Sequence, residues 1–193
     1  MPVGSRLEYT RCCMGLYAGF CITQVAFPRW RGSGRYVDPM LKPGDKAPNF
    51  TLVDQHGEKF SLSGSLKNRK VWHMLYFYPK ADTPGCTTQA CGLRDIADDV
   101  GDTEIIGISP DSPSRQARFD EKYGLGFRLL ADEDHAIADA YGVWGEKSMY
   151  GKKFMGIVRS AFLVDAKGRV AEAWYKVSPK DTPKNLLAAL DEG

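Results

Sequence analysis

The sequence predicts an α/β fold with a mixed central sheet flanked by helices. Apolar runs typical of buried strands alternate with segments typical of helices between residues 71 and 141, an order that favours parallel strands. Two hairpin patterns, near residues 50–62 and 159–176, add antiparallel strands. With 193 residues, 43% of them hydrophobic and 26% charged, the chain has the size and composition of one globular domain.

The first half of the domain begins with an extended, proline-rich entry at Leu41. Apolar and polar residues alternate at 50–53 and 59–62 on either side of Asp54-Gln-His-Gly, which predicts a β-hairpin. The apolar run Val71–Tyr78 is typical of a fully buried central strand. Pro79 ends this strand because proline has no N–H group to donate to a neighbouring strand.

Apolar runs, alternating apolar and polar residues, and residues typical of helix starts predict the remaining strands and helices. We expect strands at 104–109, 127–130, 159–164 and 170–176, and helices at 84 to about 100, 113–123, 134–141 and 181–190. Trp144 and the stretch 147–154 look like a surface loop near the functional site. In the last helix, Leu186, Leu187 and Leu190 share one face.

Cys86 is the residue whose position in the sequence indicates a reactive side chain. Thr83-Pro84-Gly85 is a helix entry, with a hydroxyl that can cap the helix and a proline suited to its first turn. Cys86 therefore falls in the first turn, just beyond the carboxyl end of the central strand. Free backbone N–H groups and the positive end of the helix dipole favour the thiolate there. The sequence predicts that Cys86 is a nucleophile.

These residues resemble a known family. Pro79, Thr83 and Cys86 match the P-x-x-x-T-x-x-C signature of the peroxiredoxins. The string YPKADTPGCTTQACGLRD resembles the bacterioferritin-comigratory, or peroxiredoxin Q, branch, whose second cysteine corresponds to Cys91. The resemblance continues through AYGVWGEKSMYGKKFMGIVRSAFLVD, where Arg159 matches the active-site arginine of the family. It covers about residues 41–190.

The resemblance implies a thioredoxin-like fold and a thiol-dependent peroxidase. Cys86 would be oxidised by hydrogen peroxide or an organic hydroperoxide to a sulfenic acid, and Cys91 would then form a disulfide with it. Thr83 and Arg159 would donate hydrogen bonds to the peroxide. A thioredoxin- or glutaredoxin-type protein would reduce the disulfide, and the branch implies a monomer. No metal, haem or flavin cofactor is implied.

Two of these residues also have simpler interpretations. Without the family match, Arg159 would be an arginine at a strand edge paired to a surface acid, and Cys91 a small buried hydrophobic residue. Positions i and i+5 of an intact helix have Cα atoms roughly 8–9 Å apart, whereas a disulfide needs about 7 Å or less. If Cys91 resolves the sulfenic acid, the helix must unwind in each cycle. We expect Gly92→Ala to strengthen the helix and slow this step.

Other functions are less consistent with the sequence. A thiol–disulfide oxidoreductase usually has a C-x-x-C motif, which is absent. A redox-sensing or holdase-like interaction protein would use the thiols without turnover, and an assay of peroxide consumption separates it from a peroxidase. His56, His73 and His135 have no metal-ligand spacing to the cysteines.

The first forty residues differ from the rest and are predicted to be a leader or an unstructured extension of a domain at 41–193. They carry five Arg against Glu8 and Asp38, or +3, so a net charge of +2 leaves 2 − 3 = −1 for the domain. A near-neutral domain argues against nucleic acid as a partner, and the apolar run 12–27 is short for a membrane span. We expect a cytoplasmic protein, with export or organelle targeting as the alternative if residues 1–40 act as a targeting segment.

Overall fold

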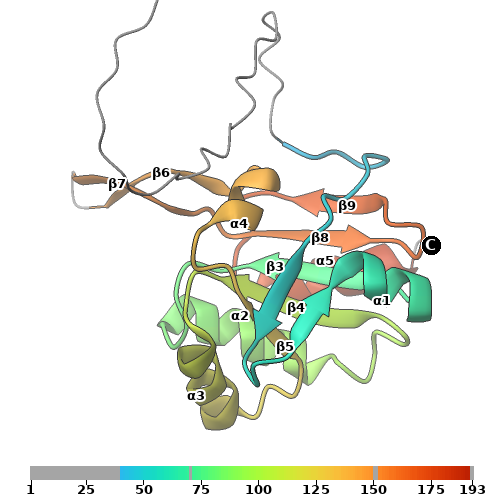
Figure 1. Cartoon of the computed structure of the whole chain (residues 1–193), viewed down its shortest axis with the longest axis horizontal. Helices are drawn as coiled ribbons and strands as arrows, with labels where there is room; N and C mark the ends of the chain where they lie inside the picture. The colour runs from blue at the N-terminus through green and yellow to red at the C-terminus, as the bar shows by residue number, and fades with distance from the viewer. Residues whose placement is uncertain (1–39, 70, 150–151, 192–193) are drawn as a thin grey trace, which may run out of the picture. The chain divides into compact units, whose positions relative to one another are not determined.

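The computed structural model describes residues 40–69, 71–149 and 152–191 (Figure 1). Within these residues, seven strands form the main sheet in the order β2-β1-β5-β4-β3-β8-β9, and β6 and β7 form a separate hairpin. The strands of the main sheet are β1 (Thr51–Asp54), β2 (Lys59–Ser61), β3 (His73–Phe77), β4 (Glu104–Ser109), β5 (Arg128–Ala131), β8 (Ser160–Val164) and β9 (Val170–Trp174). The helices are α1 (Leu62–Arg69), α2 (Pro84–Asp95), α3 (Pro113–Tyr123), α4 (Ala136–Ala140) and α5 (Asp181–Asp191).

The sheet is mixed, as predicted. β3, β4 and β5 are parallel, whereas β8 runs antiparallel to β3 and β9 runs antiparallel to β8. On the other side, β1 pairs antiparallel with β5 and with β2. β3 therefore lies in the interior of the sheet, with a strand hydrogen-bonded along each edge. This position explains why its sequence is apolar on both faces.

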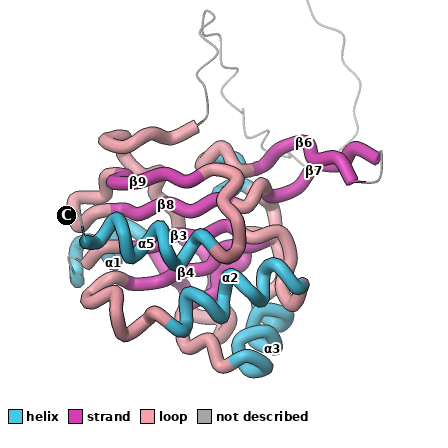
Figure 2. The backbone as a smooth tube through the Cα atoms, turned by 180° about the vertical axis from the view of Figure 1, so that it is seen from behind, coloured by secondary structure: helices cyan, strands magenta, loops and turns pink. Residues whose placement is uncertain are grey.

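Alternate side chains of β3 supply two separate cores. Leu75 and Phe77 belong to the core on one face, to which α1 contributes Leu62. Met74 and Tyr76 belong to the core on the other face. That second core contains Leu93 of α2, Phe119 of α3 and Leu186 of α5. Figure 2 shows α2 and α5 on this side of the sheet. Cys86 is part of the same core, so the reactive thiol is supported by fully buried apolar side chains.

Two elements were not predicted. Residues 62–69 form α1, although Gly64, two serines and an asparagine give this segment low helix propensity. The amide of Ser63 donates to the Asn49 Oδ1 atom at 2.9 Å, which satisfies one of the free N–H groups at the start of the helix. The expected strand 59–62 accordingly ends at Ser61, because Leu62 turns into the helix.

The second unpredicted element is the hairpin of β6 (Trp144–Met149) and β7 (Lys152–Ile157), in a stretch that was interpreted as a surface loop. These strands pair with each other, with Trp144 opposite Ile157 and Lys147 opposite Phe154. Glycines and lysines obscure the strand pattern in the sequence, since both residue types are depleted in strands. The hairpin extends away from the main sheet in Figure 1.

Helix α2 is also shorter than predicted. It ends at Asp95, whereas the sequence indicated an end near residue 100. The predicted leader lies outside the described residues, apart from Met40, so the domain boundary near residue 40 stays a prediction.

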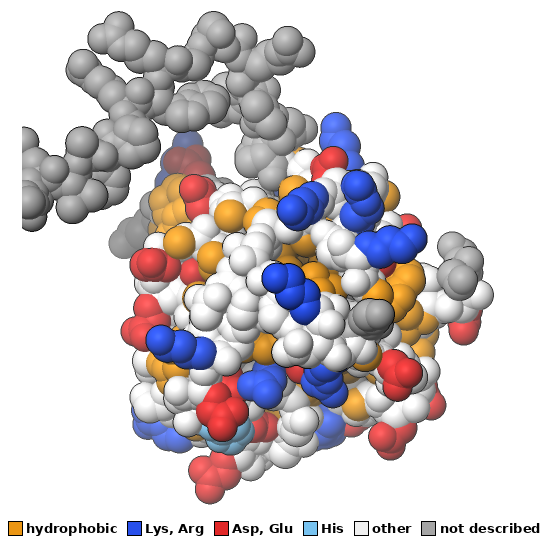
Figure 3. Space-filling model, turned by 45° about the vertical axis from the view of Figure 1, so that its right-hand side comes forward, with side chains coloured by type: hydrophobic (Ala, Val, Ile, Leu, Met, Phe, Trp, Pro, Cys, Tyr) orange, Lys and Arg blue, Asp and Glu red, His pale blue; other side chains and the backbone are white. Residues whose placement is uncertain are grey.

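None of the helices in the described ranges has both the length and the apolar character needed to cross a membrane. On the face shown in Figure 3, basic and acidic side chains are interspersed, in keeping with the small net charge of the domain.

Candidate active site

Cys86 is the third residue of α2 and only 1% exposed. Thr83 precedes the helix with extended backbone angles (φ −107°, ψ 151°), and Pro84 is its first residue. The first-turn N–H groups have no partner within a helix, so they and the helix dipole act on the buried sulfur. Cys91 lies on the same uninterrupted helix and is half-buried, and both are free thiols. The geometry is that of an activated thiol with a second thiol one and a half turns away.

The Thr83 side chain does not cap the helix, in contrast to the expectation from the sequence. Its hydroxyl donates instead to the carbonyl oxygen of Lys80 at 3.0 Å, within the loop that leads into α2. This hydrogen bond directs the hydroxyl hydrogen toward the loop, and no side-chain hydrogen bond caps the first turn of α2. Because its single hydrogen is committed to Lys80, Thr83 differs from the donor that the family resemblance implied: its oxygen retains lone pairs to accept a further hydrogen bond.

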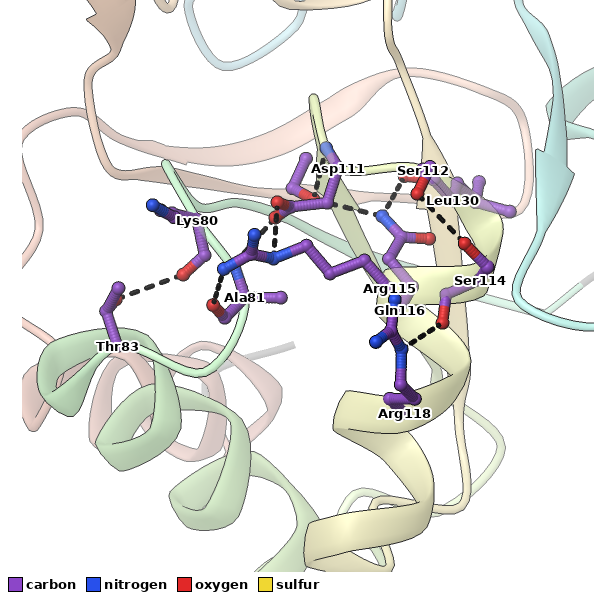
Figure 4. Close-up of polar contacts among 11 residues, drawn as sticks. Lys80, Ala81, Thr83, Asp111, Ser112, Ser114, Arg115, Gln116, Arg118 and Leu130 are labelled. Atoms are coloured by element: carbon purple, nitrogen blue, oxygen red, sulfur yellow. Dashed lines mark hydrogen bonds and ion pairs between the residues drawn. The ribbon is translucent and has the colours of Figure 1, made fainter.

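The loop before α2 is held in place by α3 and by the residues that lead into it (Figure 4). The amide of Ala81 donates to Asp111 Oδ2 at 2.6 Å, and Arg115 Nη2 donates to the Ala81 carbonyl at 3.2 Å. Arg115 Nε also forms an ion pair with Asp111 Oδ1 at 3.0 Å. Both backbone groups of Ala81 are therefore fixed by one charged pair, which sets the path of the chain five residues before Cys86.

Arg159 is brought to the thiol by the pairing of β8 with β3. Ser160 lies opposite Phe77, so Arg159 lies beside the carboxyl end of β3, where the chain leads into α2. Its backbone carbonyl accepts a hydrogen bond from the amide of Val177 at 3.0 Å. Its Nη2 atom lies 3.3 Å from the sulfur of Cys86. The structure thus unites two residues that are 73 positions apart in the chain.

Two small features of α2 determine how closely the guanidinium approaches. A Cβ atom at Gly85 would lie 3.2 Å from Arg159 Nη2 and 3.5 Å from the ring of Pro179, so glycine leaves room for the guanidinium. The Nη1 atom of Arg159 donates to Oε1 of Gln89, which is fully buried. Arg159 is therefore held on one side by the thiol and on the other by an amide from the same helix.

A further cation enters the site from the β6–β7 hairpin. The ammonium group of Lys147 donates to the carbonyl oxygen of Ile157, two residues before Arg159. Burial and the neighbouring charge of Arg159 lower the pKa of Lys147, whereas the charge of Cys86 acts in the opposite direction. The aliphatic stem of Lys147 and the ring of Phe154 both pack over Gly156. Lys147 is therefore within electrostatic reach of the thiol.

Gln89, Gly85 and Lys147 were missed as site residues by the sequence analysis. A signal existed for Gln89, because residue i+3 from Cys86 lies on the same face of a helix. Tyr76 of β3 is fully buried, and burial raises its pKa well above the ordinary value. Lys147 could not be identified because the hairpin that carries it was not predicted.

Other parts of the described chain have fewer side chains that could act as catalytic groups or metal ligands. A groove of ≈ 540 Å³ lies near the amino ends of β3 and β4, and Asp54, Glu104 and Arg128 line it. These charged groups are paired with one another, Arg128 with both acids. Among the described residues, there is no group of three or more His, Cys, Asp and Glu side chains that could hold a metal ion. The thiol at the start of α2 is therefore the feature with the clearest reactivity.

Comparisons with known proteins agree with this geometry. Residues 43–173 match the model of the AhpC/TSA family. The chain is 51% identical over 132 residues to peroxiredoxin Bcp of Escherichia coli K12, covering 67% of this chain and 83% of the relative. It is 45% identical over 154 residues to peroxiredoxin Bcp of Bacillus subtilis, covering 79% and 96%.

Solved structures show the same fold. The peroxidoxin BcpB of Mycobacterium tuberculosis superposes with a TM-score of 0.69 at 33% identity, covering 79% of this chain and 97% of that one. The bacterioferritin comigratory protein of Xanthomonas campestris superposes with a TM-score of 0.68 at 36% identity, covering 74% and 90%. The predicted thioredoxin-like fold is confirmed by these neighbours. With the sequence relatives, they place the chain in the AhpC/TSA family as a peroxiredoxin, a thiol-dependent peroxidase with an antioxidant function.

Proposed function

We propose that this chain reduces hydrogen peroxide and organic hydroperoxides with Cys86 as the peroxidatic thiol. The observation that carries the proposal is the buried Cys86 sulfur in the first turn of α2, with Arg159 Nη2 at 3.3 Å. Backbone N–H groups and a permanent positive charge both stabilise a thiolate. The same groups are hydrogen-bond donors for the oxygen that acquires negative charge during the reaction.

In the first step, the Cys86 thiolate attacks the terminal oxygen of the hydroperoxide. An S–O bond forms, the O–O bond breaks, and the leaving alkoxide or hydroxide takes up a proton to give alcohol or water. Arg159 stabilises the charge on the leaving oxygen. The Thr83 hydroxyl donates to the Lys80 carbonyl, which leaves its oxygen to accept the hydrogen of the incoming hydroperoxide. Cys86 is converted to a sulfenic acid. Pro79, which follows β3, directs the chain from the sheet into this loop.

In the second step, the thiol of Cys91 displaces hydroxide from the sulfenic acid, releasing water and forming the Cys86–Cys91 disulfide. Both thiols lie on α2, so a single chain supplies both and a monomer suffices. Because residues five apart on a helix are too far apart to bond, part of α2 unwinds before this step. A dithiol protein of the thioredoxin or glutaredoxin type then restores both thiols by exchange.

The substrate range includes alkyl hydroperoxides. The solved structure of the Xanthomonas campestris relative is described in terms of alkyl peroxide reduction activity, and it covers 74% of this chain. An alkyl group adds apolar surface to the substrate, and the exposed ring of Phe154 (44% exposed) on β7 is an apolar surface on the hairpin that brings Lys147 to the site. We propose that this ring contacts the alkyl group.

The test is peroxide consumption in the presence of thioredoxin, thioredoxin reductase and NADPH. Cys86→Ser abolishes consumption. Cys91→Ser still consumes one equivalent of peroxide per chain but does not turn over with thioredoxin. Peroxide consumption that survives Cys86→Ser contradicts the assignment of the nucleophile, and sustained turnover of Cys91→Ser contradicts the assignment of the resolving thiol. Disulfide exchange without peroxide consumption would indicate an oxidoreductase instead.

A further inference from the structure

A chain of hydrogen bonds runs from the active-site arginine to the start of the last helix. Arg159 Nη1 donates to Gln89 Oε1, and Gln89 Nε2 in turn donates to the hydroxyl oxygen of Thr182 at 3.0 Å. The Thr182 hydroxyl donates to the backbone carbonyl of Ser178 at 3.1 Å. Gln89 and Thr182 are both fully buried, so water cannot substitute for a missing partner without entering the core.

The donor–acceptor direction of this series of hydrogen bonds follows from the last one, between Thr182 and Ser178. A backbone carbonyl accepts hydrogen bonds and cannot donate, so the single hydrogen of the Thr182 hydroxyl is committed to Ser178. The Thr182 oxygen can then only accept, and it therefore binds the NH₂ group of the Gln89 amide. As a result, the carbonyl oxygen of that amide faces Arg159. With the opposite amide orientation, an NH₂ group would face the guanidinium, and two donors would oppose each other.

We propose that Thr182 is a positioning residue for the peroxidatic site: through Gln89, it orients the amide that holds Arg159 against the Cys86 sulfur. Thr182 is on α5, a different element from both the thiol and the arginine, and no hydrogen bond joins it to either of them. The Arg159 carbonyl also accepts from Val177, so the backbone and the head group of the arginine are anchored to one segment, residues 177–182. This inference rests on the proposed roles of Cys86 and Arg159.

The first experiment compares Thr182→Val with Thr182→Ser in the full chain. Valine keeps the shape and removes the hydroxyl, whereas serine retains it. We expect Thr182→Val to slow single-turnover oxidation of Cys86 by hydrogen peroxide about tenfold, and to shift the pH dependence of Cys86 alkylation to higher pH. Thr182→Ser remains within about twofold of the parent. Thr88→Val, which removes a hydroxyl from the exposed side of α2, next to Gln89, leaves both measurements unchanged.

The second experiment separates positioning from a structural role. Both oxygens of a carboxylate are acceptors, so Gln89→Glu presents an acceptor to Arg159 in either orientation. In that background, adding Thr182→Val changes the oxidation rate and the alkylation profile by no more than about twofold. If Thr182→Val slows oxidation equally in the parent and in the Gln89→Glu background, Thr182 has only a structural role. If Thr182→Val alone leaves the oxidation rate and the alkylation profile unchanged, the proposal is overturned. Alkylation is measured without peroxide, so failure of the proposed peroxidase activity would be recognised separately.

Discussion

Gly92 of α2 lies directly against Pro183 of α5: a Cβ atom at position 92 would approach the Pro183 Cγ atom to 2.9 Å. The two helices therefore touch at a residue next to Cys91. Together with the hydrogen bond between Gln89 and Thr182, this contact joins the face of α2 to the start of α5. Any unwinding of α2 that brings Cys91 to Cys86 must loosen this interface.

The first prediction corrects the expectation for Gly92→Ala. In an isolated helix, alanine is more favourable than glycine by about 1 kcal/mol. Here the added methyl group overlaps a proline ring, and overpacking of a core typically costs about 1–3 kcal/mol. We expect Gly92→Ala to lower the free energy of unfolding by about 1 kcal/mol in urea titrations, and to speed disulfide formation after oxidation, because the interface is already loosened.

Gly64→Ala is the matched control for this change. A Cβ atom at Gly64 in α1 would lie 3.4 Å from the nearest atom, the Cβ of Ser61. The substitution should therefore show the ordinary benefit of alanine in a helix, a gain of about 0.5–1 kcal/mol. If Gly92→Ala stabilises the protein as much as Gly64→Ala does, then the contact with Pro183 does not constrain α2.

The second prediction concerns Gly85 and Arg159. A methyl group at Gly85 would lie 3.2 Å from Arg159 Nη2, so Gly85→Ala displaces the guanidinium from the sulfur. We expect sulfenic acid formation to slow about tenfold, and about a hundredfold in Arg159→Lys, since lysine lacks the planar fork that reaches both the thiol and Gln89. Stopped-flow measurement of single-turnover oxidation provides the rates. Rates unchanged in both variants would mean that Arg159 has no part in peroxide reduction.

The third prediction concerns the movement that precedes disulfide formation. In the reduced protein, α2 is continuous from Pro84 to Asp95 and both thiols are free. Hydrogen exchange after oxidation should show loss of protection over residues 84–93. Residues 182–186 should lose protection as well, since α5 packs on α2, while β3 stays protected. Equal protection of α2 in both redox states would rule out unwinding and leave Cys91 as a packing residue.

The fourth prediction is a pH dependence of stability at Glu104. Burial raises the pKa of this carboxyl, but the interaction with His73, whose Nε2 atom lies 3.5 Å from Glu104 Oε2, and the charges of Arg69 and Arg128 outweigh burial, so the pKa lies below its ordinary value of 4.5. A depressed folded-state pKa stabilises the protein above pH 4.5, and this contribution is lost as the pH falls through the folded-state pKa. Glu104→Gln should therefore lower the free energy of unfolding at pH 7 by about 1–2 kcal/mol.

The difference between Glu104→Gln and the parent should shrink as the pH falls below 4.5 and through the lower folded-state pKa, because the carboxyl of the folded parent then becomes neutral as well. Urea titrations at pH 7 and at lower pH provide the comparison. Glu121→Gln, at an exposed position of α3, is the control and should differ little from the parent at any pH. A difference at Glu104 that is independent of pH would show that its charge contributes nothing to stability.

The sequence by itself determined the elements that carry the chemistry. The apolar run before Pro79 marked the central strand, and Thr83-Pro84-Gly85 marked the start of the helix with Cys86 in its first turn. These features are local: burial of a strand and the start of a helix depend on residues that are neighbours in the chain. The motif around Cys86 was also specific enough to indicate the peroxiredoxin family, which the comparisons confirm.

Only the tertiary structure decided which distant residues complete the site. The register of β8 against β3 places Arg159 next to Cys86, and the packing of α5 on α2 joins Thr182 to Gln89. The local pattern could not reveal Lys147, because the hairpin that carries it is stabilised by pairing between two strands of weak propensity. Gly85 and Gly92 have ordinary helical neighbours in the sequence. Their importance arises from Arg159 and Pro183, side chains that only folding brings within contact distance of α2.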